Sequence, residues 1–274
     1  MRFQRIDLPV HNPDHWADWF ATALGLTRLS GSPEAPDAPD APVATDASCG
    51  VALGWTELRF VQDAHPEPGS ALNTGETNDT SDTSDTSDAG DADGTGESAA
   101  RGHHLAFAVP TGTIEDAAAW IIAVTGERLM DDDGTTLIDR GGSWASRSIY
   151  FRGPEHSILE LIEHADRPAP APDSTPGVLR DSGPDLLLGV AEIGIGTPDV
   201  AGTAADLENS DRAADLPFGF GDPAHKVIAA YGDSDGAFIL AAADRPWYPT
   251  QDVLPVTSRP TVEMSRSGRR HRSR

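Results

Sequence analysis

The chain has almost no cysteine and no long apolar run. Cys49 is the single cysteine among 274 residues, which excludes a disulfide framework and a cysteine-based zinc site. No apolar run approaches the roughly 18 residues that a membrane-spanning helix needs, and the N-terminus lacks the charged-then-apolar pattern of a signal peptide. We therefore expect a cytoplasmic protein that has no membrane partner.

Lysine is nearly absent as well, although acidic residues abound. The 44 Asp and Glu face 20 basic residues, of which Lys226 is the only lysine, and the formal net charge is −24. Such a surface repels itself in dilute buffer and is stabilised when salt screens it. This composition suggests a salt-rich, halophilic cytoplasm, and it argues against a nucleic-acid partner.

Three segments have too little apolar character to join a core. Residues 66–100 contain a threefold Thr-Ser-Asp repeat and predict a disordered acidic insert. Residues 166–185 are rich in proline and predict a linker, and residues 257–274 predict a basic, disordered tail.

Between these segments one pattern recurs: a strand, a helix and then three strands. Residues 3–10 alternate in polarity as a strand does, and the apolar spacing becomes helical from Asp14. The pattern returns after residue 101 and again after residue 187. We therefore expect an α+β protein of repeated βαβββ units, with two units paired in residues 1–165 and a third in residues 186–256.

Two of the predicted strands each contain one good metal ligand. His104 lies in His-His-Leu-Ala-Phe, and Glu160 lies in Ile-Leu-Glu-Leu-Ile, among apolar neighbours in both cases. An ionisable side chain inside an apolar strand needs a compensating partner. Imidazole and carboxylate are ligands of divalent Fe, Mn, Ni or Zn, so a shared ion is one hypothesis. A buried His–Glu hydrogen bond that satisfies both groups is the other.

The ordered motifs resemble the vicinal oxygen chelate superfamily, which contains glyoxalase I, extradiol dioxygenases and bleomycin-binding proteins. The resemblance is carried by Leu8-Pro9-Val10, Trp19-Phe20, Leu24-Gly25-Leu26, His103-His104-Leu105-Ala106-Phe107, Tyr150-Phe151-Arg152-Gly153-Pro154 and Leu159-Glu160-Leu161. It implies mixed sheets curled around a cavity, with metal ligands on the first and fourth strands of each unit.

By that resemblance His104 and Glu160 fall on the two ligand positions of the second unit and serve as its catalytic residues. The same positions of the first unit hold Arg5 and Arg59, which offer no lone pair to a cation. Asp7, two residues from Arg5 on the same strand face, is then the expected third ligand.

In the third unit Glu192 suits a ligand position, but Ile239 or Leu240 occupies the fourth-strand position. Arg5 and Arg59 are expected to bind an anionic part of the substrate. Trp144 and Tyr150 are expected at the cavity mouth.

The resemblance implies a metal-dependent enzyme of glyoxalase or ring-cleaving dioxygenase type, acting on a small molecule with vicinal oxygens. The alternative is a metal-free protein that binds an aromatic or antibiotic-like compound in the same cavity. Because an unpaired third unit leaves a sheet edge open, a homodimer is also expected.

Overall fold

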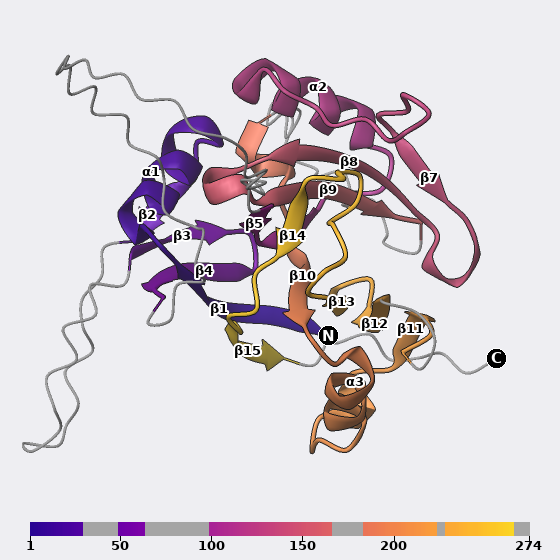
Figure 1. The fold of residues 1–274 in the computed structure, drawn as a ribbon. Helices are drawn as coiled ribbons and strands as arrows, with labels where there is room; N and C mark the ends of the chain where they lie inside the picture. Colours follow the sequence, from indigo (N-terminus) through magenta and orange to yellow (C-terminus); the bar gives the residue numbers. More distant parts are fainter. Residues whose placement is uncertain (30–48, 64–98, 166–182, 224–227, 266–274) are drawn as a thin grey trace, which may run out of the picture.

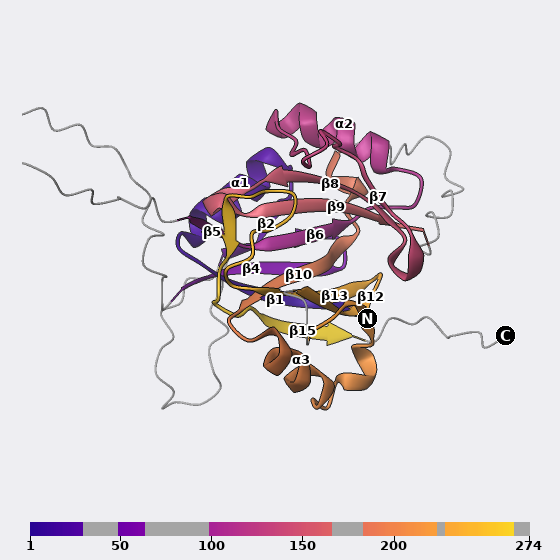
Figure 2. The same cartoon turned by 45° about the vertical axis from the view of Figure 1, so that its right-hand side comes forward.

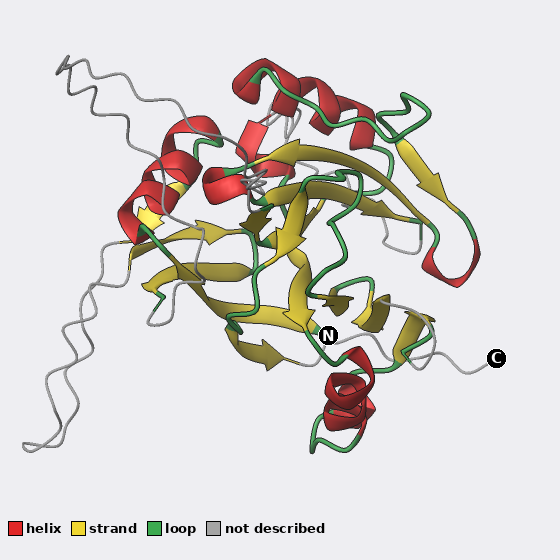
Figure 3. Ribbon diagram, in the orientation of Figure 1, coloured by secondary structure: helices red, strands yellow, loops and turns green. Residues whose placement is uncertain are grey.

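The computed structural model describes residues 1–29, 49–63, 99–165, 183–223 and 228–265. Most of the acidic insert expected at 66–100 and most of the linker expected at 166–185 lie outside these residues, although Ala100 begins a strand. In the described part three α-helices lie on the outer side of mixed sheets (Figure 3). The predicted α+β class with curled mixed sheets is confirmed.

Two large sheets and one strand pair make up the β-structure of the described residues (Figure 1). The first sheet has the order β15 (Thr261–Ser265), β1 (Arg2–Val10), β4 (Thr56–Gln62), β3 (Cys49–Leu53) and β2 (Thr27–Leu29). The second has the order β11 (Phe218–Gly221), β12 (Ile228–Asp233), β13 (Gly236–Ala242), β10 (Gly189–Thr197), β6 (His104–Ala108), β9 (Ile158–His164), β8 (Ser146–Arg152) and β7 (Ile138–Arg140). The pair is β14 (Val253–Pro255) with β5 (Ala100–Gly102).

The strand order of the first unit, β1-β4-β3-β2, recurs as β6-β9-β8-β7 and as β10-β13-β12-β11. In each set the first and fourth strands are parallel, and the second and third units join because β6 and β10 pair antiparallel. The pairing expected within residues 1–165 is therefore wrong: the second unit shares its sheet with the third. The first unit forms the other sheet.

The edge of the first unit is covered by the end of the chain. β15 pairs antiparallel with β1 and lies beside it in both views (Figure 2). The disordered tail expected from residue 257 is thus corrected, because residues 261–265 form a strand. The homodimer was expected from an open edge on an odd unit. It stays a prediction, which light scattering in multimolar salt tests.

Each helix covers its own unit with an apolar face. In α1 (Pro13–Ala23), which Asn12 caps, Trp16 and Phe20 pack on Phe60 of β4. The second helix, α2 (Ile114–Thr125), covers β8 and β9, and α3 (Val200–Glu208) covers β12 and β13. Short 3₁₀ turns are η1 (Gly142–Trp144), η2 (Pro154–His156), η3 (Gly183–Leu186) and η4 (Ala213–Asp215).

The start of α2 is capped from a distant strand. Thr113 at its N-cap makes no side-chain cap, and the Glu163 carboxylate of β9 instead accepts the N–H groups of Gly112, Thr113 and Ile114 at 2.8–3.0 Å. A carboxylate at a helix N-terminus satisfies free N–H groups and complements the helix dipole. This contact fixes α2 on β9.

Candidate metal centre

His104 begins the central strand β6 of the second sheet and is 6% exposed. Its Nδ1 lies 3.1 Å from the carbonyl oxygen of Ile158, the residue opposite it on β9. An Nδ1–H that donates to this carbonyl leaves the lone pair on Nε2, which is the arrangement of most metal-binding histidines. Nε2 is therefore the atom that His104 offers to the site.

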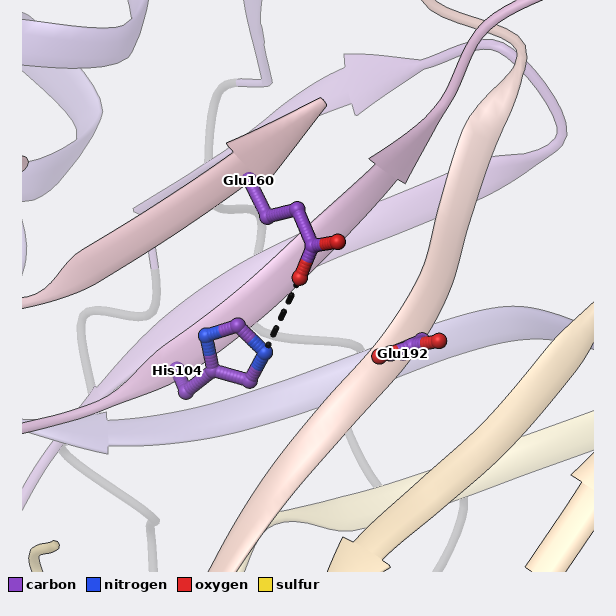
Figure 4. Close-up of side chains that lie close together, drawn as sticks. All are labelled: His104, Glu160 and Glu192. Carbon is purple, nitrogen blue, oxygen red and sulfur yellow. Dashed lines mark ion pairs between the residues drawn. The ribbon is translucent and has the colours of Figure 1, made fainter. Parts of the chain in front are cut away.

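Glu160 approaches that atom from the neighbouring strand. It lies on β9 opposite Ala106, two residues beyond His104 on the same face of β6, and it is 2% exposed. Its Oε2 is 3.4 Å from the His104 Nε2 (Figure 4). Two ligand atoms bound at about 2.1 Å to one ion lie roughly 3.0–3.4 Å apart between right-angle and tetrahedral geometry, so this separation suits a shared ion.

Glu192 completes the group from the other side of β6. It lies on β10, also opposite Ala106, and is 6% exposed. Figure 4 shows the three side chains from three adjacent strands, and one ligand atom of each lies within 4.8 Å of the other two. Because the small Ala106 stands between the two carboxylates, the space above it stays open to them.

The electrostatics of the group are set by burial and by like charge. Burial, and then the charge of Glu160, raises the pKa of Glu192 to about 8, although Trp144 Nε1–H donates to its carboxylate at 3.1 Å. Burial opposes protonation of His104, but the hydrogen bond and charge of Glu160 outweigh it and raise the pKa of His104. Two buried carboxylates thus share one imidazole, and the group binds protons readily.

The group lines a cavity of about 260 Å³ between the second and third units. This is just below the roughly 300–1,000 Å³ of typical ligand pockets, so it suits a small molecule. Its walls are largely aromatic and aliphatic, and two arginines also line it; the lining residues are His104, Arg140, Trp144, Ser146, Tyr150, Glu160, Ile162, Glu192, Phe220, Ile228, Ile239, Arg245, Trp247 and Tyr248.

One glycine allows the aromatic wall to approach the histidine. The Trp247 ring lies 5.2 Å from the His104 ring, centroid to centroid. A Cβ at Gly194 of β10 would lie 2.7 Å from Trp247 Cη2 and 2.8 Å from His104 Cβ. Contacts this short would force a displacement. Because Gly194 has no side chain, Trp247 and His104 can keep these positions.

The strand pattern identifies the fold. Two βαβββ units join through their first strands, curl around a cavity, and present candidate ligands on a first and a fourth strand. The chain has a vicinal oxygen chelate fold.

Comparison with known proteins adds only distant similarities. No family model and no curated protein matches the chain. It is similar to the structure of a putative dioxygenase from Bacillus subtilis, with 16% identity and a TM-score of 0.49 over 88% of this chain and 63% of that one. Glyoxalase I from Zea mays has 14% identity and a TM-score of 0.42, over 88% of this chain and 66% of that one. Lactoylglutathione lyase from Agrobacterium tumefaciens has 13% identity and a TM-score of 0.32, over 58% of this chain and 91% of that one. Because these TM-scores are below 0.5, the fold assignment rests on the strand order.

The vicinal oxygen chelate fold brings together four of the residues that the sequence predicted for the site. His104, Glu160, Trp144 and Tyr150 all line the cavity. Tyr150 lies opposite Glu160 in the β8–β9 pair, and burial and then the Glu160 charge raise its pKa well above the usual range.

Arg5, Asp7 and Arg59 were expected at the same site, and this is wrong. They lie on the first sheet and do not line the cavity. Arg5 Nε donates to Asp7 at 2.8 Å, and Arg59 pairs with Glu57. Asp7 is thus occupied by its own strand neighbour. The physical reason is that the first unit does not pair with the second, so its strands lie in another sheet.

The pairing of the first and fourth strands nevertheless shows that the same positions correspond in all three units. Arg59 lies opposite Asp7, two residues beyond Arg5, as Glu160 lies opposite Ala106, two residues beyond His104. By the same count Ile239 lies opposite Gly194, two residues beyond Glu192. The first unit has an arginine at each of its two ligand positions, paired with Asp7 and Glu57 of the same strands, and the third unit has a single carboxylate.

Sequence reasoning set aside Glu192 for lack of a fourth-strand partner, and it missed Arg140 and Arg245. The signal at Glu192 was a carboxylate inside the apolar run Val190–Ile195. No local signal marks the two arginines.

Among the described helices, none is long and apolar enough to cross a membrane.

Proposed function

We propose that the chain is a metal-dependent small-molecule enzyme of glyoxalase or ring-cleaving dioxygenase type, in which His104, Glu160 and Glu192 hold one divalent ion. The observation that carries this proposal is the group itself: two buried carboxylates and one imidazole within 4.8 Å of one another, at the wall of a cavity. Asp7 has no part in it.

Charge balance supports an ion. Burying an ionised carboxylate costs several kcal/mol unless a cation compensates it. Without an ion, the pKa of Glu192 rises to about 8 because burial excludes water and because Glu160 is near. A divalent cation neutralises both carboxylates together. The neutral His104 Nε2 then supplies the third ligand, oriented by Ile158.

A purely structural pair explains less. A His–Glu hydrogen bond satisfies His104 and Glu160, but it needs no third acidic residue. Glu192 adds like charge to that pair in the interior, and the described residues offer it only the Trp144 N–H as an ordinary hydrogen-bond donor. Natural cores avoid such a residue unless it has a function.

An ion held by His104, Glu160 and Glu192 would polarise two vicinal substrate oxygens and would stabilise negative charge on them. The chain supplies the surroundings. Trp144 holds the Glu192 carboxylate, and the rings of Tyr150, Trp247 and Phe220 form apolar walls that exclude water from a planar substrate. The metal, the substrate and the direction of the reaction belong to the proposal.

Metal analysis of protein purified without chelator tests the proposal. Wild type, Glu160→Ala and Glu192→Ala are compared with Glu57→Ala, which removes a half-exposed carboxylate of the first sheet. We expect about one divalent ion per chain in wild type and in the control, and less than a tenth of that in the two site variants. Negligible metal in all four, even after incubation with Mn²⁺, Fe²⁺, Ni²⁺ and Zn²⁺, would refute the metal site.

The same proteins separate an enzyme from a binding protein. Metal-dependent turnover of a catechol or of a hemithioacetal supports the enzyme. Metal-free binding of such compounds, without turnover and unchanged in Glu192→Ala, supports the alternative, a metal-free protein that binds an aromatic or antibiotic-like molecule.

A further inference from the structure

Two arginines lie at the cavity, one from each unit that forms it. Arg140 ends β7 in the second unit, and Arg245 follows β13 in the third. Arg140 is exposed and Arg245 is half-buried. They are near enough that burial and then the positive charge of Arg140 lower the pKa of Arg245. Two cations from separate units therefore converge on one cavity.

Neither arginine has an acidic partner among the described residues, where no carboxylate lies within 4.0 Å of either guanidinium. The described residues Arg101, Arg128, Arg212 and Arg259 also have no carboxylate within 4.0 Å, so what distinguishes Arg140 and Arg245 is that both lie at one cavity. Several other arginines do pair with a carboxylate; they are Arg2, Arg5, Arg28, Arg59, Arg147 and Arg152. An acidic protein that leaves two arginines together at a cavity has kept them available for an external anion.

Their present contacts hold the arginines without neutralising them. The Arg140 guanidinium lies over the Tyr248 ring, 5.0 Å from its centroid, and the Tyr248 hydroxyl donates to Asp131 at 3.3 Å. Arg245 Nη1 donates to the Pro246 carbonyl at 3.4 Å. A guanidinium has five N–H donors, so both retain donors for a ligand. The ring contact fixes the direction of Arg140.

We propose that Arg140 and Arg245 bind the carboxylate of the substrate, whose vicinal oxygens lie at the His104, Glu160 and Glu192 group. The substrate class is then a small planar acid, with two adjacent oxygens at one end and a carboxylate at the other. A carboxylate between two guanidinium groups accepts charge-assisted, bidentate hydrogen bonds and removes their mutual repulsion. The cavity of about 260 Å³ and its aromatic walls suit one ring of this kind.

This inference rests on the proposed function for the orientation of the substrate, but the arginine pair can be tested without metal. The probes are 3,4-dihydroxybenzoate and 3,4-dihydroxybenzamide, which have the same shape and the same vicinal hydroxyls and differ in the charge of one end. Dissociation constants are measured by calorimetry at fixed salt, with the protein once free of metal and once loaded with Mn²⁺.

For wild type we expect the acid to bind at least tenfold more tightly than the amide in both forms, since hydrogen bonds to charged groups are each worth roughly 1.5–3 kcal/mol. Arg140→Gln and Arg245→Gln should each lower this preference severalfold, and the double variant should abolish it. Arg28→Gln, which alters an exposed arginine of the first unit, should leave it unchanged. Arg245→Lys should retain part of it, which separates loss of charge from loss of fold.

The outcomes distinguish the two proposals. Equal affinity for acid and amide, or no binding of either probe, overturns the arginine pair whatever the metal content. A clear preference for the acid in metal-free protein, together with failure to bind any metal, supports the arginine pair and refutes the metal site. A preference that survives in the double variant places the anion elsewhere and overturns the inference.

Discussion

Replacing Glu192 by glutamine should stabilise the metal-free protein, because this carboxylate is buried beside another. The pKa of Glu192 is about 8, against an ordinary value of 4.5. A carboxyl whose pKa is raised on folding favours the folded state fully below pH 4.5, and this contribution is lost as the pH rises to about 8. At about 1.4 kcal/mol per pH unit, the loss between pH 5 and pH 7.5 is about 3 kcal/mol. Glutamine keeps the shape and does not ionise.

Urea unfolding followed by tryptophan fluorescence measures this effect. With EDTA present we expect Glu192→Gln to gain about 3 kcal/mol over wild type on going from pH 5 to pH 7.5. Glu163→Gln is the matched control, since Glu163 is also buried but accepts three N–H groups of α2. That substitution should destabilise the protein by roughly 1–3 kcal/mol, because it removes charge-assisted hydrogen bonds. The same chemical change should thus have opposite signs at the two positions.

Bound metal should make wild type more stable than Glu192→Gln. An ion present at 1,000 times its dissociation constant stabilises the folded protein by about 4.1 kcal/mol, which exceeds the loss of about 3 kcal/mol worked out above. Glu192→Gln lacks one anionic ligand, so its stabilisation by Mn²⁺ or Zn²⁺ should be small. The reasoning is refuted if metal-free Glu192→Gln is no more stable than wild type at pH 7.5, or if metal stabilises the two proteins equally.

Three further changes test separate parts of the site and fold. Gly194→Ala should lower metal affinity at least tenfold, with β10 intact, because its methyl displaces Trp247 and His104; unchanged affinity in a calorimetric titration contradicts this. Metal binding should strengthen from pH 6 to pH 9 and release protons, because the pKa of Glu192 and that of His104 are both raised; calorimetry in buffers of different ionisation enthalpy counts the protons. Ending the chain before Thr261 removes β15 and exposes β1, which should lower the unfolding midpoint in urea and promote self-association in light scattering.

The sequence predicted the local elements of this fold better than their partners. Alternating residues 3–10 became β1 and the helical spacing after Asp14 became α1. The strand β7, at residues 138–140, has too few residues to show a period, so the sequence alone does not display it. Period and capping depend on neighbours in the chain, which a single sequence displays.

Pairing between units depends on contacts that a single sequence does not display. All three units carry similar patterns, so proximity in the chain favoured joining the first to the second. The structure joins β6 to β10 and leaves β1 to β15. That choice explains the outcome at the site: His104 and Glu160 lie within one unit and were found, whereas Asp7 was chosen in place of Glu192 because the wrong unit was taken as partner.

The register also explains why the second and third units carry the site and the first does not. With β15 on one side of β1 and β4 on the other, Arg5 and Asp7 pair with each other on the face of the first sheet. In the second sheet β6 is flanked by β9 and β10, so Ala106 has an acidic residue opposite it on either side. Here the three ligands come from three adjacent strands, and the small Ala106 lies at the centre. A partner strand that contributes Glu263 opposite Arg5 makes an ion-pair ladder there, whereas one that contributes Glu192 opposite Ala106 makes a place for a cation.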